Sequence, residues 1–177
     1  MPKRDLISWS AMMGIYAQQS EGKEAIKLFT DMKEEVDANE VTFVSVVDAC
    51  TNSKILIEGK IIHFCAILDG FDTDNEVLNA LVNMYGKCGD LMEAEMVFNT
   101  ISQQNNVSSV TAILSVYVEQ GQGNKALQLY ANQRNNIFFD DVIAICILQA
   151  CSLTANLEVC RQIHFDIVST GLSCVKS

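Results

Sequence analysis

The sequence repeats itself at fixed offsets, and this feature limits the chain to a small set of folds. Tyr16, Tyr85 and Tyr117 stand in similar contexts, with 69 residues from the first to the second and 32 from the second to the third. Ala49-Cys50 recurs 101 residues later as Ala150-Cys151. Internal repeats with a period of about 30–45 residues indicate an α-solenoid, in which each unit buries its apolar face against the next unit.

The clearest unit includes residues 79–98 and predicts two short helices folded back on each other. Apolar residues recur at helical spacing in each half. Gly86 and Gly89 bracket the turn, and Asp90 with Glu93 three residues later has the spacing of a capping box. A single hairpin cannot bury both of its apolar stripes, so the sequence predicts neighbouring hairpins. The stripes comprise Leu78, Leu81, Val82 and Tyr85 on the first helix and Ala94, Val97 and Phe98 on the second.

The repeat registers divide the chain into five units, which we expect to form one domain. Residues 1–5 have the character of the end of a preceding unit, so we expect the chain to be part of a longer array. The five units cover residues 6–39, 40–74, 75–106, 107–140 and 141–175, with Asn106 as an extra residue at the third junction. The expected fold is all-α, an open right-handed superhelix of about five helical hairpins.

Alignment of the units predicts which positions lie in the core. Two registers are apolar in every unit, and a third holds small residues that allow close helix packing. The first apolar register holds Met13, Val47, Val82, Leu114 and Leu148, the second holds Leu28, Ile62, Val97, Leu129 and Ile163, and the small register holds Ala25, Gly59, Ala94, Ala126 and Cys160.

The charge, the hydrophobic pattern and the cysteines limit which functions we expect of the chain. The formal net charge is −10, which opposes the basic surface expected of a nucleic-acid binder and favours a protein-interaction solenoid. No apolar run approaches the ~20 residues of a membrane span, so we expect no membrane partner. Residues 1–5 lack the character of a targeting segment. The seven cysteines form no CxxC pair and are expected to be reduced, buried thiols.

Neither histidine is predicted to be catalytic or to bind a metal. His63 and His164 share the register of Phe29, Phe98 and Tyr130, so we expect them to pack in the core. The sequence has no zinc-ligand spacing, no nucleophile constellation and no phosphate-binding glycine loop. We therefore expect no enzyme activity, no cofactor, no metal and no small-molecule substrate.

Three stretches resemble the pentatricopeptide repeat family, in its plant arrangement of alternating P, L and S repeats. They are DLISWSAMMGIYAQ from Asp5, VTFVSVVDAC from Val41 and NALVNMYGKCGDL from Asn79. The resemblance covers essentially the whole chain and implies a binder of single-stranded RNA in a mitochondrion or chloroplast, with RNA editing or processing factors as partners. Some relatives end in a deaminase-like domain, which needs an H-x-E and a CxxC zinc site. This chain has neither, so the resemblance implies a non-catalytic adaptor.

In this family the fifth and last residues of a unit together contact one base. Carried onto this chain, the pairs resemble those that select adenine in the first unit, a pyrimidine in the third and guanine in the fourth, whereas Val44 and Ile145 leave the second and fifth units without a polar fifth residue. The expected RNA contacts are the pairs Ser10 with Asn39, Asn79 with Asn105 or Asn106, and Thr111 with Asp140, the second residues Ile7, Val41 and Val142, and Lys87.

Two alternatives remain open. The chain could be a protein-interaction scaffold of the tetratricopeptide type, or a degenerate piece of an array with no function of its own. The polar fifth residues favour RNA binding, and the acidic net charge favours protein binding.

Overall fold

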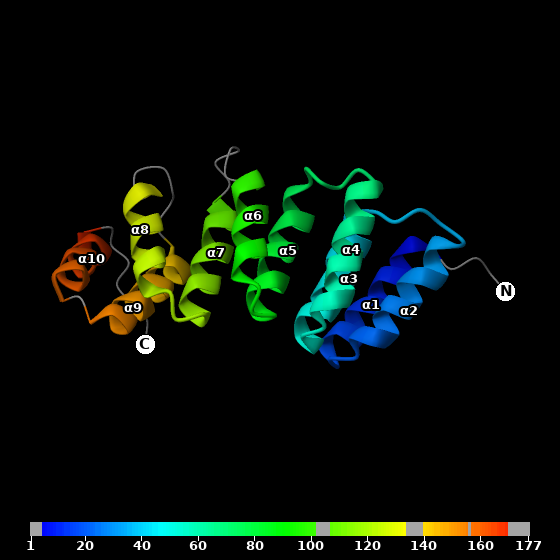
Figure 1. Cartoon of the computed structure of the whole chain (residues 1–177), viewed down its shortest axis with the longest axis horizontal. Coiled ribbons are helices and arrows are strands. Elements are labelled where there is room, and N and C mark those ends of the chain that lie inside the picture. The colour runs from blue at the N-terminus through cyan, green and yellow to red at the C-terminus, as the bar shows by residue number, and fades with distance from the viewer. Residues whose placement is uncertain (1–4, 102–106, 134–139, 156, 170–177) are drawn as a thin grey trace.

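The computed structural model describes residues 5–101, 107–133, 140–155 and 157–169, and these residues form helices and no strand (Figure 1). The all-α fold predicted from the repeats is confirmed. In chain order the helices are α1 (Leu6–Gln18), α2 (Gly22–Lys33), α3 (Glu40–Ser53), α4 (Leu56–Leu68), α5 (Asn75–Lys87), α6 (Leu91–Ile101), α7 (Val107–Glu119), α8 (Gly123–Gln133), α9 (Asp141–Thr154) and α10 (Leu157–Ser169).

The odd-numbered helices are the first helices of five hairpins, and side-chain caps fix where four of them begin. An Asp or Asn immediately before the helix accepts a hydrogen bond from a free amide of the first turn, which stabilises that end. The same chemistry starts α6, where Asp90 accepts from the Glu93 amide at 3.3 Å. The four first-helix caps are Asp5 to the Ser8 amide, Asn39 to Thr42, Asp74 to Val77 and Asp140 to Ile143, at 2.8–3.0 Å.

The hairpins stack in a row, so that each contacts mainly its neighbours (Figure 1). The first helices pack one against the next from α1 to α9 and form one layer. Each second helix packs against its own first helix, and α2, α4, α6 and α8 also pack against the first helix of the following hairpin. Helix pairs stacked in this way form an α-solenoid.

Most of the predicted core is buried, and Leu148 is a clear exception. Met13, Val47, Val82 and Leu114 are fully buried, but Leu148 in the same register is 45% exposed, so its assignment to the core was wrong. In the earlier hairpins this register belongs to first helices that have a further first helix packed beyond them. No described helix follows α9 in that layer, so Leu148 has nothing to pack against.

Most positions of the other two predicted core registers are also buried. Ile62, Val97 and Ile163 are buried, as are Ala25, Ala94 and Ala126. Leu28, Leu129 and Cys160 are only half-buried and pack at the margin of the core. Cys50 and Cys151 are buried as predicted.

The two histidines differ in environment. His63 is half-buried, its Nδ1 lies 2.9 Å from the Tyr85 hydroxyl, and the two rings meet edge to face with centroids 5.7 Å apart. His164 is exposed, so the prediction that it packs in the core was wrong. His63 packs against a residue of the next hairpin, and α10 has no described hairpin after it.

Candidate nucleic-acid interface

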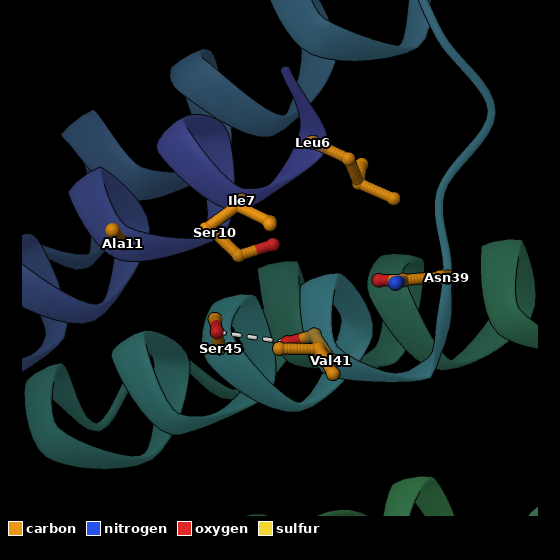
Figure 2. A pocket seen from close by; sticks show the side chains of 7 residues that line it. All are labelled: Leu6, Ile7, Ser10, Ala11, Asn39, Val41 and Ser45. Atoms are coloured by element: carbon orange, nitrogen blue, oxygen red, sulfur yellow. Dashed lines mark hydrogen bonds between the residues drawn. The ribbon is translucent and has the colours of Figure 1, made fainter.

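A cavity of about 340 Å³ lies between the first halves of α1 and α3 (Figure 2). Its walls include four residues that the sequence predicts as RNA contacts: Ile7 and Ser10 from α1, Val41 from α3, and Asn39 from the segment that leads into α3. The volume falls within the range of about 300–1,000 Å³ typical of ligand sites. The structure therefore brings the predicted residues of the first unit together with Val41 of the second unit around one space.

The polar end of this cavity is a hydrogen-bonded chain of three side chains. The Thr42 hydroxyl donates to Asn39 Oδ1 at 2.7 Å, and the Thr42 amide donates to the same oxygen at 3.0 Å. The hydroxyl oxygens of Ser10 and Thr42 lie 3.2 Å apart, also in hydrogen-bond contact. Ser10 and Asn39 are therefore coupled through Thr42, which is completely buried.

The other walls are apolar and open to solvent. Ile7 is 78% exposed on α1, and Val41 is 51% exposed on α3. Exposed branched side chains on both sides of a polar floor give a surface on which the flat face of a base could pack while its edge meets Ser10 and Asn39. Base stacking on protein side chains combined with hydrogen bonds to base edges is the usual mode of single-stranded RNA recognition.

The third unit is described only in part. Asn79 lies half-buried on α5, and its Oδ1 atom is buried with no hydrogen-bond partner in the described part of the chain. Its predicted partners Asn105 and Asn106 lie outside the described residues. A buried amide oxygen without a partner is costly.

The fourth unit presents its predicted pair on two neighbouring first helices. Thr111 is half-buried on α7, and Asp140 is half-buried at the start of α9, where its carboxylate caps the helix. Val142, the predicted contact at the second position of the fifth unit, is 50% exposed on α9.

Lys87, the one predicted cation of the interface, lies exposed at the end of α5. It is within electrostatic range of Asp48 on α3. Desolvation raises the pKa of the Asp48 carboxyl group, and the positive charge of Lys87 opposes that rise. The lysine charge is therefore partly offset by a neighbouring carboxylate.

Sequence reasoning missed Thr42 and the capping role of the unit-ending residues. Thr42 is completely buried and its register holds both polar and apolar residues, so the sequence pattern gives no signal for it. The capping role could have been predicted, because Asp or Asn stands directly before a helical pattern at Asp5, Asn39, Asp74 and Asp140.

Metal ligation and membrane insertion find no support in the described ranges. No group of three or more His, Cys, Asp or Glu side chains there is arranged to hold a metal ion. No helix in the same ranges is both long and apolar enough to span a bilayer.

Two models of the pentatricopeptide repeat match the chain. The model of the PPR repeat family matches residues 4–52, and that of the PPR repeat matches residues 76–105. The chain is also similar to curated proteins of Arabidopsis thaliana. It is 35% identical over 181 residues to one pentatricopeptide repeat-containing protein, 36% over 156 residues to the chloroplastic protein CRR2, and 32% over 162 residues to a mitochondrial one. These alignments cover 100%, 86% and 90% of this chain.

The structure is similar to the crystal structure of the pentatricopeptide repeat protein PPR10 from maize. The TM-score is 0.73 with 16% sequence identity, and the match covers 94% of this chain and 24% of that one. This likeness concerns the fold. The chain spans about a quarter of the length of the curated relatives named above, 24–26% of each.

Proposed function

The chain belongs to the pentatricopeptide repeat family, and from this premise we propose that it binds single-stranded RNA sequence-selectively, as a non-catalytic part of an adaptor in organellar RNA processing or editing. The observation that carries the proposal is the cavity between α1 and α3, where Ile7, Ser10, Asn39 and Val41 converge. Those are the residues that the family resemblance implies as base contacts.

The order of the units sets the expected RNA sequence. With the amino-terminal unit towards the 5′ end, the preferred core is adenine, an unselected base, a pyrimidine and then guanine. A chloroplast or mitochondrion is the proposed compartment, because relatives of both kinds match the chain.

The third unit provides the sharpest test. Asn79→Thr removes the side-chain amide and should shift preference at that position from pyrimidine towards purine. Fluorescence anisotropy with RNAs that differ only at that base measures the shift, and a good bidentate base contact is worth about 1–3 kcal/mol by analogy with DNA recognition. Equal discrimination before and after the substitution would mean that Asn79 does not contact RNA.

A control separates this effect from a loss of folding. Asn99→Thr makes the same chemical change on α6, a second helix, where the side chain is exposed. It should leave the base preference unchanged.

A protein-interaction scaffold is the second candidate, and one surface favours it. Along α4 runs an exposed apolar stripe of Ile57, Ile61, Phe64 and Leu68, each more than half exposed. Met92 and Met96 are similarly exposed on α6. The matching positions of α2 are all polar: Lys23, Lys27, Thr30 and Glu34. Contiguous exposed apolar surface is typical of interaction sites.

A photo-crosslinking residue distinguishes the two candidates. Placed at position 64, it should capture protein from a plant organelle extract if α4 is an interaction surface. Placed at position 30, the same register on α2, it should not. Protein capture at position 64, together with no RNA binding by the chain, would favour the scaffold function over RNA binding.

A further inference from the structure

We infer that Thr42 fixes the hydrogen-bond polarity of the first-unit cavity, so that Ser10 acts as an acceptor and Asn39 as a donor towards a bound base. The inference rests on the proposed RNA-binding function and names a positioning residue within it. Thr42 itself is buried behind the two base-contacting side chains.

The polarity follows from counting protons. A threonine hydroxyl has one proton and two lone pairs. Thr42 Oγ1 lies 2.7 Å from Asn39 Oδ1, and a side-chain carbonyl oxygen can only accept, so the Thr42 hydroxyl proton is donated to Asn39. The contact of 3.2 Å between Thr42 and Ser10 must then be donated by Ser10. The Ser10 proton points inward, and its lone pairs remain for a ligand.

Asn39 is oriented by the same contacts. Its Oδ1 accepts from both the amide and the hydroxyl of Thr42, so Nδ2 cannot exchange places with the oxygen without losing two hydrogen bonds. The Nδ2 group is therefore the end of Asn39 that is available as a donor. The side chain cannot offer its oxygen to a base while Thr42 holds it.

An acceptor beside a donor distinguishes two classes of base. Adenine and cytosine present an exocyclic amino donor next to a ring-nitrogen acceptor on their Watson–Crick edges. Guanine and uracil present the opposite polarity, an exocyclic carbonyl acceptor next to a ring N–H donor. Hydrogen bonding to such edges is how unstacked bases are distinguished. With Ser10 facing the amino group and Asn39 the ring nitrogen, the cavity suits adenine, the base expected from the repeat register.

The other units show that the relay is not a requirement of the fold. The other residues in the register of Thr42 are Ser8, which is exposed, and Val77, Ser109 and Ile143, which are completely buried. A hydroxyl therefore stands in the units that follow the polar Ser10 and Asn79. The apolar Val77 and Ile143 stand in the units that follow Val44 and Thr111. Val77 also shows that a valine at this register is compatible with the repeat.

The test compares three variants of the full chain. RNAs that differ only in having adenine or guanine at the first-unit position are titrated against wild type, Thr42→Val and Thr42→Ser. Wild type should prefer adenine on the order of tenfold, within the range of one good base contact. Thr42→Val frees the Ser10 proton and removes one of the two hydrogen bonds that orient Asn39, so it should reduce this preference to about twofold or less. Thr42→Ser keeps the hydroxyl and should retain the preference.

Thr51→Val is the matched control. Thr51 is also buried on α3, but its hydroxyl donates to the Val47 carbonyl within the helix and lies outside the cavity. This variant should lose some stability and keep the base preference. An adenine preference that survives Thr42→Val overturns the role of Thr42 and leaves RNA binding intact. Wild type that binds none of the RNAs overturns the proposed function and, with it, this role.

A measurement without RNA tests the polarity directly. The Thr42 hydroxyl proton should exchange slowly with water in the NMR spectrum of the free chain and show a cross-peak to the Asn39 side chain. Fast exchange of that proton would overturn the inference whatever the RNA result.

Discussion

At the scale of single residues, the side chains expected to contact bases also hold the helices in place. Asn39 and Asp140 each end a unit, and each caps the first helix of the next unit. A cap uses the side-chain oxygen, so the groups left for RNA are those that the cap does not use. Specificity and stability are therefore coupled at the same atoms.

Substitution of Asn39 separates the two roles. Asn39→Ala removes the cap of α3 and should lower the free energy of unfolding by about 1 kcal/mol. Asn39→Asp keeps an oxygen to cap the helix, so it should leave stability nearly unchanged while it removes the amide donor and the adenine preference. Urea denaturation and RNA titration of both variants measure the two effects. Equal loss of stability in both variants would mean that capping is not what Asn39 contributes.

His63 gives the chain a pH-dependent contact. Burial lowers the pKa of this imidazole below its ordinary value, with a weaker opposing effect of Glu93. The unfolded chain then takes up the proton at a higher pH than the folded chain does. The contribution of His63 to stability is therefore complete above the unfolded pKa of about 6.5 and is lost as the pH falls below it.

The predicted consequence is a difference between wild type and His63→Phe. From pH 8 to pH 5.5 the Tm of wild type should fall more than that of the variant. At pH 8 the variant should itself be less stable by about 1 kcal/mol, because the Tyr85 hydroxyl loses its partner. Adding Tyr85→Phe should recover part of that loss. Parallel pH profiles for wild type and His63→Phe would contradict the assignment.

At the scale of helices, close approach between hairpins depends on glycine at the start of second helices. A Cβ atom built on Gly22 would lie 2.9 Å from the Ala49 carbonyl oxygen, and one on Gly123 would lie 2.8 Å from that of Ala150. Both contacts are with backbone of the following hairpin, which cannot move aside alone. Gly22 and Gly123 are themselves 101 residues apart, so one close packing contact is used twice.

Gly22→Ala should destabilise the chain by about 1–3 kcal/mol through overpacking. Gly14→Ala is the matched control, because Gly14 lies within α1 with open space around the added methyl group. That change should be neutral or stabilise by up to about 1 kcal/mol, since alanine favours the helix. Chemical denaturation measures both, and a stability loss at Gly14 as large as that at Gly22 would contradict the packing argument.

At the scale of the whole molecule, the repeat pattern predicts the solenoid because helix periodicity and unit length are local properties of the sequence. The expected burial of Met13 and Val47 follows from the same periodicity. The pattern does not predict the exposure of Leu148 and His164, because burial in a solenoid depends on which neighbour is present. It also does not predict the Thr42 relay, which depends on distances between side chains on two hairpins.

Charge is the other property of the whole molecule, and it leads to a prediction about salt. The net charge is −10, and the one lysine expected at the interface, Lys87, lies in the field of Asp48. RNA affinity that depends on phosphate contacts falls with salt, with a slope of about −0.7 per contact for single strands. With one or two such contacts, the plot of log K against log salt concentration should have a slope of about −1.

Lys87→Gln should make this slope shallower by about 0.7, the share of one phosphate contact. Lys23→Gln removes the same charge from the exposed surface of α2, away from the interface, and should leave the slope unchanged. Either lysine variant should reduce the RNA affinity in low salt only slightly. Asn39→Asp should reduce the base discrimination more, because contacts with base edges and not with phosphates dominate the predicted interface. A wild-type slope steeper than about −3 would mean that four or more phosphates are contacted, and the cavity between α1 and α3 could not then be the main source of binding.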